Sequence, residues 1–509
     1  MKNIFRPIAL LVVICLMTSL LASCGGKKNT EDDGAKKTVI TKDYVITVPD
    51  RDKVTSTMAK DLKNDILEAT GISLMVSSDW VANESEIPQK EIIVGKTARS
   101  ESEEIYSQLG QHEWTVTAKD EKIIIAGTTV KALSDAIRYF VDTYVSGKTT
   151  VEMEINAVKN GRTKLVLFEW KDGKLINTGI NGGYPRLYAL KDGTLLLAYD
   201  GMYVRRSENN GLTWGPAVKA SLDYPGTANA ALFQDEDGVI YLGFRSTGYN
   251  ADKSFFANIH VTCSKDNGKT WQKHSTVYEN TEPTGVFKGV WEPHFGMMNG
   301  KLTCFYANDS TNIIEHYQNI EYKQWDPNAK KWDNRTVVCD GKAHQSRDGM
   351  PVWQQLSTGE YVCVIEAFNK DDNNCFAIKL TWSDDGKNWS EPVTVMRAKK
   401  KGTACAAPYI VELPNGQIVI SCQTNEKTVE STKENYIMST VISDGTPVKF
   451  ISEENFSSHD YPCTDLSVLG KAMWNGMYVH NGFIFTCSIA NDSMAQIKIN
   501  RFKFSDLLE

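Results

Sequence analysis

Residues 186–200 read RLYALKDGTLLLAYD, two short apolar runs joined by the dipeptide Asp192–Gly193. An Asp-Gly pair between two apolar runs is typical of a tight β-hairpin. Five similar segments follow along the chain, and their turn glycines lie 45 to 66 residues apart. The six segments are RLYALKDGTLLLAYD (186–200), AALFQDEDGVIYLGFR (230–245), PHFGMMNGKLTCFYAND (293–309), VWQQLSTGEYVCVIEAF (352–368), YIVELPNGQIVISCQTNE (409–426) and NGMYVHNGFIFTCSIAND (475–492). Six hairpins at this period predict an all-β fold, a six-bladed β-propeller with four-stranded blades over residues 164–509.

A second motif recurs on the outer hairpins of several predicted blades. The octapeptides SENNGLTW (207–214), SKDNGKTW (264–271) and WSDDGKNW (382–389) resemble the Asp-box, S-x-D-x-G-x-x-W, of sialidase-type propellers. In such a turn the aspartate accepts hydrogen bonds from turn amides, the glycine takes a positive φ and the tryptophan packs between sheets. The segment QWDPNAKKW (324–332) is similar to a degenerate copy. The motif indicates the fold and leaves the function open.

The first 24 residues have the pattern of an export signal. Lys2 and Arg6 precede an apolar run over residues 8–21, which is short for a membrane span. This run ends in LASC, and the segment resembles a bacterial lipoprotein signal, which implies cleavage before Cys24 and attachment of lipid to its thiol. Residues 25–38 would then be a polar tether. We expect an exported protein that is lipid-anchored to a bacterial membrane; a plain secretory signal with an incidental cysteine is the alternative.

Residues 39–161 mix strand and helix patterns. The segments YVITVP (44–49), EIIVG (91–95) and KIIIAG (122–127) are typical of strands, and apolar residues recur at helical spacing in two places. Those residues are Val54, Met58, Leu62 and Ile66 in the first place, and Leu133, Ile137, Phe140 and Val141 in the second. The pattern predicts a small α/β or α+β domain. It is similar to accessory domains that precede catalytic modules in some bacterial glycosidases.

The composition excludes some classes of function. The chain has 509 residues and a formal net charge of -7, whereas a protein that binds the nucleic-acid backbone needs a basic face. None of the eleven cysteines belongs to a C-x-x-C pair. Several lie in apolar runs, where a free cysteine behaves as a small buried hydrophobe: Cys304, Cys363, Cys422 and Cys487. We therefore expect no nucleic-acid partner, no metal site and no cofactor.

Polar residues end the apolar runs of the hairpins at a common register. Six of these residues stand seven or nine positions after the turn glycine of their hairpin. Two more polar residues and one tryptophan stand seven or eight positions before it. They are Asp200, Arg245, Glu366, Gln423, Asp309 and Asn491 after the glycine, and Arg186, Glu292 and Trp474 before it. Because the two strands of a hairpin are antiparallel, both sets lie at one rim of the propeller. The sequence predicts a polar mouth there, with Glu292 and Glu366 facing one pocket from neighbouring blades.

Two carboxylates in one pocket are what hydrolysis of a glycosidic bond requires. One attacks or stabilises the anomeric carbon and the other protonates the leaving oxygen, while burial and neighbouring charge separate their pKa values. Glu292 stands between Trp291 and Pro293, where an ionised carboxylate loses hydration. Either glutamate by itself is also explained as a buried structural partner of an arginine. The candidate arginines are Arg186, Arg245 and Arg347.

Five stretches together resemble the six-bladed exo-α-L-arabinanases of glycoside hydrolase family 93. They are GYPRLYALKDGTLLLAYD (183–200), VWEPHF (290–295), SRDGMPVWQQLSTGEYVCVIEAF (346–368), SCQTNE (421–426) and AMWNGMYV (472–479). The resemblance implies an exo-acting, retaining glycoside hydrolase of an α-L-arabinan-like plant or host polysaccharide, with Glu292 as nucleophile and Glu366 as acid/base. It also implies that seven residues line the sugar subsites: Arg186, Arg245, Asp309, Arg347, Asp348, Gln423 and Trp474.

Two other functions stay open at this point. An exo-sialidase shares the Asp-boxes and an arginine in the first blade, but it needs three arginines that clamp the substrate carboxylate. After Arg347 the chain has only Arg397 and Arg501, so this clamp is incomplete. The other alternative is a surface propeller that binds glycan without chemistry, and the presence of both glutamates argues against it. The sequence leaves the sugar, its linkage and the role of the accessory domain undetermined.

Overall fold

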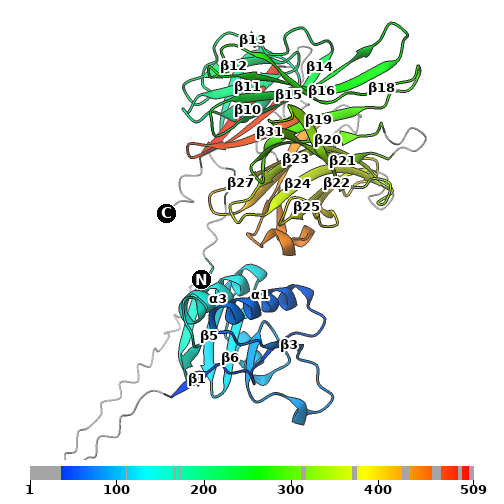
Figure 1. The fold of residues 1–509 in the computed structure, drawn as a ribbon. Helices are drawn as coiled ribbons and strands as arrows, with labels where there is room; N and C mark the ends of the chain where they lie inside the picture. The colour runs from blue at the N-terminus through cyan, green and yellow to red at the C-terminus, as the bar shows by residue number, and fades with distance from the viewer. Residues whose placement is uncertain are drawn as a thin grey trace, which may run out of the picture.

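The computed structural model describes residues 36–110, 112–163, 168, 170, 173–310, 317–369, 375–426, 436–460, 472–490 and 496–503. The predicted signal with Cys24, residues 25–35 of the predicted tether, and Asn491 lie outside these residues. The chain forms two folded units, an accessory domain followed by a β-propeller (Figure 1). No helix in the described part of the chain has the length and apolar character needed to cross a bilayer.

The accessory domain is a six-stranded mixed sheet covered by helices. The sheet has the strand order β3-β2-β4-β6-β5-β8, and β1 pairs separately with β7. The elements are β1 (Lys37–Val39), β2 (Val45–Val48), α1 (Lys53–Thr70), β3 (Met75–Ser78), β4 (Glu91–Val94), α2 (Ser100–Tyr106), β5 (Glu113–Lys119), β6 (Lys122–Gly127), α3 (Val130–Phe140), β7 (Glu152–Glu154) and β8 (Val158–Arg162). Strand β1 therefore begins within the last two residues of the predicted tether.

Helices α1 and α3 share one apolar core with the sheet. Met58 and Leu62 of α1 and Phe140 of α3 are buried there, because their spacing places them on one helix face. Asp52 caps α1 by accepting a hydrogen bond from the Thr55 amide at 3.0 Å. The predicted second helix ends at Phe140, and a π-helical turn, Val141–Val145, follows it.

The second unit consists of six antiparallel sheets, the blades, arranged around a centre (Figure 1). Each blade begins with the two strands of one predicted hairpin. Blade 1 is β10 (Arg186–Ala189), β11 (Leu195–Tyr199), β12 (Tyr203–Ser207) and β13 (Val218–Lys219); blade 2 is β14 (Thr227–Gln234), β15 (Ile240–Tyr249), β16 (Phe255–Ser264) and β17 (Gln272–Tyr278), with β18 (Thr281–Glu282) added; blade 3 is β19 (Val290–Met298), β20 (Lys301–Asn308), β21 (Asn319–Asp326) and β22 (Lys331–Cys339). Blade 4 is β23 (Arg347–Gln355), β24 (Tyr361–Asn369), β25 (Cys375–Ser383) and β26 (Val393–Arg397); blade 5 is β27 (Cys405–Glu412), β28 (Ile418–Thr424), β29 (Ile437–Ser443) and β30 (Phe456–Asp460); blade 6 is β31 (Ala472–His480), β32 (Phe483–Ala490) and β33 (Gln496–Lys503), completed by β9 (Lys174–Asn181).

Strand β9 joins the two ends of the propeller. It precedes blade 1 in the chain but pairs with β33 as the outer strand of blade 6, for example Ile176 with Ile499. The red strands of blade 6 accordingly lie beside the teal strands of blade 1 (Figure 1). A sheet that contains strands from both ends of the propeller closes the ring of blades. The predicted six-bladed propeller is confirmed.

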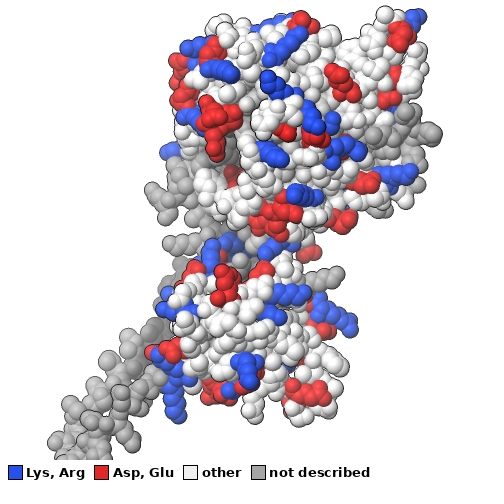
Figure 2. Space-filling view, viewed as in Figure 1, with Lys and Arg blue, Asp and Glu red and all other residues white. Residues whose placement is uncertain are grey.

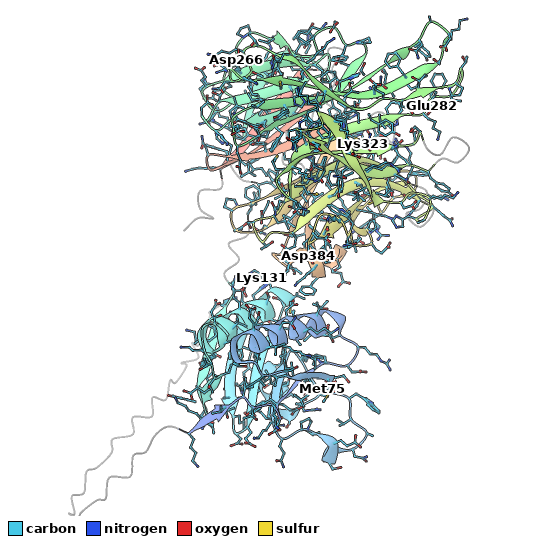
Figure 3. All side chains as sticks on the ribbon, viewed as in Figure 1. Met75, Lys131, Asp266, Glu282, Lys323 and Asp384 are labelled. Atoms are coloured by element: carbon cyan, nitrogen blue, oxygen red, sulfur yellow. The ribbon has the colours of Figure 1, made fainter. Side chains whose placement is uncertain are left out.

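The Asp-box octapeptides form turns between the third and fourth strands of their blades. In the second box Asp266 accepts hydrogen bonds from the amides of Lys269 and Thr270, and the amide of Gly268 donates to Ser264. The hydroxyl of Thr270, which donates to Asp266 Oδ2 at 2.6 Å, together with the amide of Thr270 lowers the pKa of Asp266 to about 2. Asp266 and Asp384, the latter in the third box, lie at the outer edge of the propeller (Figure 3).

The tryptophans of the boxes pack towards the preceding blade. Trp214 belongs to the core shared by blades 6 and 1, and the Trp389 ring lies 5.6 Å from that of Phe305 in blade 3. The cysteines that the sequence places in apolar strands, including Cys304 and Cys422, are buried as free thiols. The tryptophans of the boxes thus join neighbouring blades.

One turn of the propeller contacts the accessory domain. Lys449 donates to Asp61 of α1 at 2.8 Å, and the neighbouring Phe450 packs against the core of the accessory domain. On the face shown in Figure 2, lysines and arginines are interspersed with aspartates and glutamates over both units. Charges of both signs mixed in this way give no extended basic surface on that face.

Candidate active site

Each blade has one residue with a positive φ where its first strand reaches the centre of the propeller. In blades 2 to 6 this residue lies at a β-bulge, and in blade 1 it lies just before β10. The six residues are Tyr184 (φ 50°), Asn229 (60°), Glu292 (43°), Met350 (49°), Ala407 (49°) and Trp474 (52°). Each stands eight or nine residues before its turn glycine. We call these six residues the bulge ring.

The bulge ring forms one end of the central channel. Tyr184, Met350, Ala407 and Trp474 belong to one apolar cluster although they come from blades 1, 4, 5 and 6. A bulge redirects a side chain out of the regular alternation of a strand, and bulges are frequent beside active sites. Glu292 is therefore presented at the mouth of the channel by a strained backbone and not by a regular strand.

A second ring lies on the neighbouring strands, seven residues after each turn glycine. Its members are Asp200, Arg245, Ala307, Glu366, Gln423 and Ile489. Three of them accept a hydrogen bond from the bulge-ring amide of the next blade: Asp200 from Asn229 at 3.1 Å, Glu366 from Ala407 at 2.9 Å and Gln423 from Trp474 at 2.9 Å. The predicted polar register therefore serves partly to join neighbouring blades at the mouth.

Glu366 is the member of this ring that is held on both oxygens. Its Oε2 accepts from the Ala407 amide, and its Oε1 accepts from Arg347 Nη1 at 3.2 Å. Glu366 is buried, whereas the side chain of Arg347 is 40% exposed, so water screens this ion pair in part. Both oxygens of Glu366 thus accept hydrogen bonds, as the oxygens of a carboxylate do.

Glu292 has the opposite surroundings. Its Oε2 is buried and has no hydrogen-bond partner among the residues that the structure describes. Burial raises the pKa of Glu292 to about 7, and the negative charge of Glu366 adds to this rise. The cations of Arg347 and Arg245 oppose it. The two carboxyls thus interact, and near neutral pH Glu292 holds its proton for a large part of the time.

Two further predicted site residues, Asp309 and Arg245, contact Trp291, which precedes Glu292 in the chain. Asp309 accepts from the Gly289 amide at 2.7 Å and from the Trp291 indole at 3.0 Å. The guanidinium carbon of Arg245 lies 5.2 Å from the centre of the Trp291 ring, which is a cation–π contact. Asp309 and Arg245 therefore hold the indole that precedes Glu292.

Arg186 lies one layer deeper than the sequence predicts. Its Nη1 donates to the carbonyls of Pro185 at 2.7 Å and Trp474 at 2.9 Å, and its guanidinium lies 3.8 Å from the centre of the Tyr184 ring. The bulge inserts a residue into the first strand, so the position in blade 1 that corresponds to Glu292 belongs to Tyr184. Arg186 is 5% exposed and supports the mouth from beneath.

The layer beneath the mouth alternates large and small residues around the channel. Two residues after the bulge, blades 1, 3 and 5 carry Arg186, His294 and Tyr409, and blades 2, 4 and 6 carry Ala231, Val352 and Gly476. The Tyr409 ring lies 5.3 Å from the Arg186 guanidinium and 6.0 Å from the His294 ring. Burial lowers the pKa of His294 to about 3, so this histidine is uncharged and packs against its neighbours in the layer.

Asp348 is the predicted site residue that the structure separates from the others. Its Oδ1 accepts from Ser346 Oγ at 2.5 Å, and its Oδ2 lies 3.9 Å from His344 Nδ1. Successive residues of a strand point to opposite faces, so Asp348 and its neighbour Arg347 cannot both face Glu366. Arg347 does so, and Asp348 supports the junction of blades 3 and 4.

The sequence prediction did not include Tyr184 and Asn229, although both belong to the bulge ring. Tyr184 is near enough to Glu292 and Arg186 for their charges to affect its pKa, which burial raises. Asn229 Oδ1 and Arg245 Nε are buried without hydrogen-bond partners among the described residues. The near-constant distance from the turn glycine would have identified both residues, but only once the bulges are known.

The fold and the site together define a class of protein, the six-bladed propeller of sialidase type with a pair of carboxyls at one mouth of the channel. No protein-family model and no curated protein matches the chain. Its fold is similar to that of an α-L-arabinofuranosidase from Fusarium graminearum bound to an iminosugar inhibitor, with a TM-score of 0.50 and 18% identity over 65% of this chain and 95% of that chain.

Two further solved structures are similar over much of the propeller. One is an α-L-arabinanase from Penicillium chrysogenum in complex with arabinobiose, with a TM-score of 0.49 and 20% identity over 64% of this chain and 94% of that chain. The other is a Hadza microbial sialidase, with a TM-score of 0.44 and 13% identity over 65% of this chain and 67% of that chain. At 18% identity the likeness to the arabinofuranosidase shows a common fold.

Proposed function

We propose that the protein is an exo-acting, retaining glycoside hydrolase of an α-L-arabinan-like polysaccharide. The observation that carries this proposal is the pair of interacting carboxyls at the propeller mouth, with the pKa of Glu292 raised to about 7 and Glu366 paired with Arg347. When the environments of two carboxyls differ in this way, their pKa values separate, and one carboxyl can act as acid while the other acts as nucleophile. The likeness of the fold to an α-L-arabinofuranosidase supports the choice of sugar.

The charges around the two glutamates favour Glu292 as acid/base and Glu366 as nucleophile. This is the reverse of the order that the family resemblance implies. A retaining enzyme begins its cycle with a protonated acid and an ionised nucleophile. Glu292 has the raised pKa of the acid, and Glu366 accepts hydrogen bonds from Arg347 and Ala407 as a nucleophile would. Glu292 then donates its proton to the leaving oxygen while Glu366 attacks the anomeric carbon.

The same contacts argue against a sialidase. A clamp for a carboxylate needs three guanidinium groups directed at one point, and Arg186 instead donates to two backbone carbonyls while Arg347 donates to Glu366. Arg397 pairs with Glu453 on the outer part of the propeller, and Arg501 donates to the carbonyl of Asn210. These four arginines are thus committed to contacts within the protein.

The test begins with purified protein on linear α-L-arabinan, arabinoxylan, pectic side chains and sialyl-lactose, with the products identified by size. We expect a short product from one end of arabinan and intact sialosides. Release of free sialic acid would instead support the sialidase alternative. Binding of a glycan without turnover of any of them would identify a recognition protein.

Two variants then assign the roles. Glu292→Gln should lose at least about a hundredfold in rate on arabinan, but less on aryl glycosides whose leaving group needs no proton, and azide should restore part of the rate. Glu366→Gln should abolish turnover on every leaving group, because no covalent intermediate forms. The opposite pattern would restore the order implied by the resemblance. Glu236→Gln, an exposed position in the β14–β15 turn, is the matched control.

A further inference from the structure

The β15–β16 hairpin of blade 2 extends beyond the mouth of the channel. Strands β15 and β16 have ten residues each and are the longest of the described strands. Arg245 stands at the rim, and β15 continues past it to Tyr249. The hairpin projects at the upper right of Figure 1, and Glu282, which pairs with Phe255 near the end of the hairpin, marks the place in Figure 3. A raised edge therefore stands beside the mouth at blade 2.

One face of this hairpin is directed towards blade 3. Tyr249 pairs with Phe255 at the far end of the hairpin. Nearer the rim, Arg245 pairs with Ile259. Residues that pair across antiparallel strands share a face, and so do residues two or four apart along one strand. Because Ile259 packs in one core with Val290 of blade 3, the other three side chains are also on the face towards blade 3.

Four aromatic rings follow one another along this face from the mouth outwards. The Phe255 ring is stacked on that of Trp291 with the centroids 6.3 Å apart, and Trp291 directly precedes Glu292. The Phe255 ring also lies 5.6 Å from that of Phe287 and 5.7 Å from that of Tyr249. Phe287 and Tyr249 are 6.4 Å apart. We call these four rings the aromatic platform; it begins at the candidate active site and is continuous with it.

The outer two rings of the aromatic platform are exposed to solvent. Tyr249 is 62% exposed and Phe287 is 60% exposed, whereas Phe255 beneath them is 9% exposed. Leaving large apolar surface in water forgoes the free energy that its burial would give. Neighbouring exposed rings beside polar residues are a common mark of a ligand-binding surface. Room for a ligand is therefore present over the outer rings.

The backbone that carries Phe287 is fixed to the hairpin on both sides of this ring. Before it, Thr284 Oγ1 donates to the carbonyl of Asp252 in the hairpin turn at 3.4 Å. After it, the carbonyl of Lys288 accepts from Asn280 Nδ2 at 3.3 Å. Surface rings that are already held in place lose little conformational freedom when a ligand stacks on them. The aromatic platform is thus prepared for binding before a ligand arrives.

A row of exposed aromatic rings suits a chain of sugars. The C–H groups on one face of a sugar ring carry small positive partial charges, and the face of an aromatic ring is negative. The two faces attract each other, and stacking also removes apolar surface from water. Rings that follow one another at 5.6 to 6.3 Å offer such a face to more than one sugar of a chain.

We propose that the aromatic platform is a distal subsite that binds the glycan chain on the leaving side of the cleaved bond. The inference rests on the proposed function and extends it from the cleaved bond to the polymer. An exo-acting enzyme releases a short piece from one chain end, so the rest of the chain lies on the leaving side. The platform begins beside Glu292, the proposed acid, which protonates the oxygen of that leaving chain. Binding energy from the distant sugars then contributes to catalysis and favours long chains.

The test removes the two exposed rings together, Tyr249→Ala with Phe287→Ala, and varies the length of the substrate. In the unaltered enzyme kcat/KM should rise along a series of linear α-L-arabino-oligosaccharides. In the double variant most of this rise should be absent, and kcat/KM on long arabinan should fall about tenfold, because the stacking contacts are lost. The shortest oligosaccharide that is cleaved should react equally well with both proteins. The melting temperature should change little, because both side chains are exposed.

Single variants of Phe287 separate stacking from mere apolar contact. Phe287→Tyr keeps the ring and should keep kcat/KM on long arabinan, whereas Phe287→Leu keeps an apolar side chain without a ring and should lose part of it. Trp80→Ala is the matched control, because Trp80 of the accessory domain is 70% exposed and belongs to no part of the platform. We expect Trp80→Ala to equal the unaltered enzyme on every substrate.

Three results would overturn the inference and leave the proposed function intact. One is equal kcat/KM on long arabinan for the double variant and the unaltered enzyme. Another is an equal loss on the shortest oligosaccharide, which would show that the rings support the frame of the mouth. The third is a Phe287→Leu variant as active on long arabinan as Phe287→Tyr. An unaltered protein that neither cleaves nor binds any arabinan chain would overturn the proposed function and this inference with it.

Discussion

The pH dependence of stability in Glu292→Gln tests the buried carboxyl directly. The pKa of Glu292 is about 7 in the folded protein against an ordinary value of 4.5, so the folded state favours the protonated form. Each unit of pKa corresponds to about 1.4 kcal/mol, which makes the difference worth about 3 kcal/mol. The glutamate is neutral with respect to stability below pH 4.5, and its burial destabilises the protein progressively as the pH rises to about 7.

Glutamine keeps the shape of the side chain and carries no charge at any pH. The free energy of unfolding of Glu292→Gln minus that of the unaltered protein should therefore rise by about 3 kcal/mol between pH 4 and pH 8, with most of the rise below pH 7. A fixed cost of placing the amide moves the whole curve but leaves this rise unchanged. Urea unfolding of both proteins at a series of pH values measures it, and Glu236→Gln should show no such rise.

A difference that stays constant from pH 4 to pH 8 would refute the reasoning. It would mean that Glu292 ionises in the folded protein as it does in water, through contact with solvent or with a cation. The assignment of Glu292 as the acid would then lose its physical basis, whereas the pair itself would remain a candidate nucleophile and acid in the other order.

Three further predictions concern the geometry and the frame of the site. In a crystal structure the carboxyl groups of Glu292 and Glu366 should lie about 5 to 5.5 Å apart, as in retaining enzymes, and a separation above about 10 Å would exclude the pair. Gly476→Ala should destabilise the protein by about 1 to 3 kcal/mol in thermal unfolding, because the new methyl would stand 3.0 Å from Cys487 Sγ in the layer beneath the mouth. An unchanged melting temperature would show that this layer is loosely packed. Asp266→Ala should cost about 1 to 2 kcal/mol of stability through the lost turn bonds and leave kcat on arabinan unchanged, and a fall in kcat of the folded variant would contradict a purely structural role for the box.

The sequence by itself determined the number of blades and the common rim of the polar residues. The hairpin glycines from Gly193 to Gly482 repeat, and a hairpin fixes which ends of its two strands lie together. It also determined that Glu292 and Glu366 come from neighbouring blades, because they follow one another in the repeat. These properties depend on local turn chemistry and on alternation, which are readable along the chain.

Only the tertiary structure decided which residues of that rim enter the channel. The bulges of blades 3 and 6 bring Glu292 and Trp474 into the mouth, as the positive φ of Tyr184 does just before β10, while Arg186 is left beneath it. The sequence does not show a bulge, because the extra residue is defined by the register of two paired strands. Strand alternation separates Asp348 from Arg347, because successive side chains of a strand point to opposite faces of the sheet.

The different states of the two glutamates are likewise a tertiary property. The spacing of Glu366 in the repeat says nothing of the Ala407 amide in the next blade or of Arg347, which between them occupy both of its oxygens. Nor does it show that Glu292 Oε2 lacks a partner among the described residues. Burial and charge act through space between blades, so the acid and the nucleophile can be distinguished only when the ring is closed.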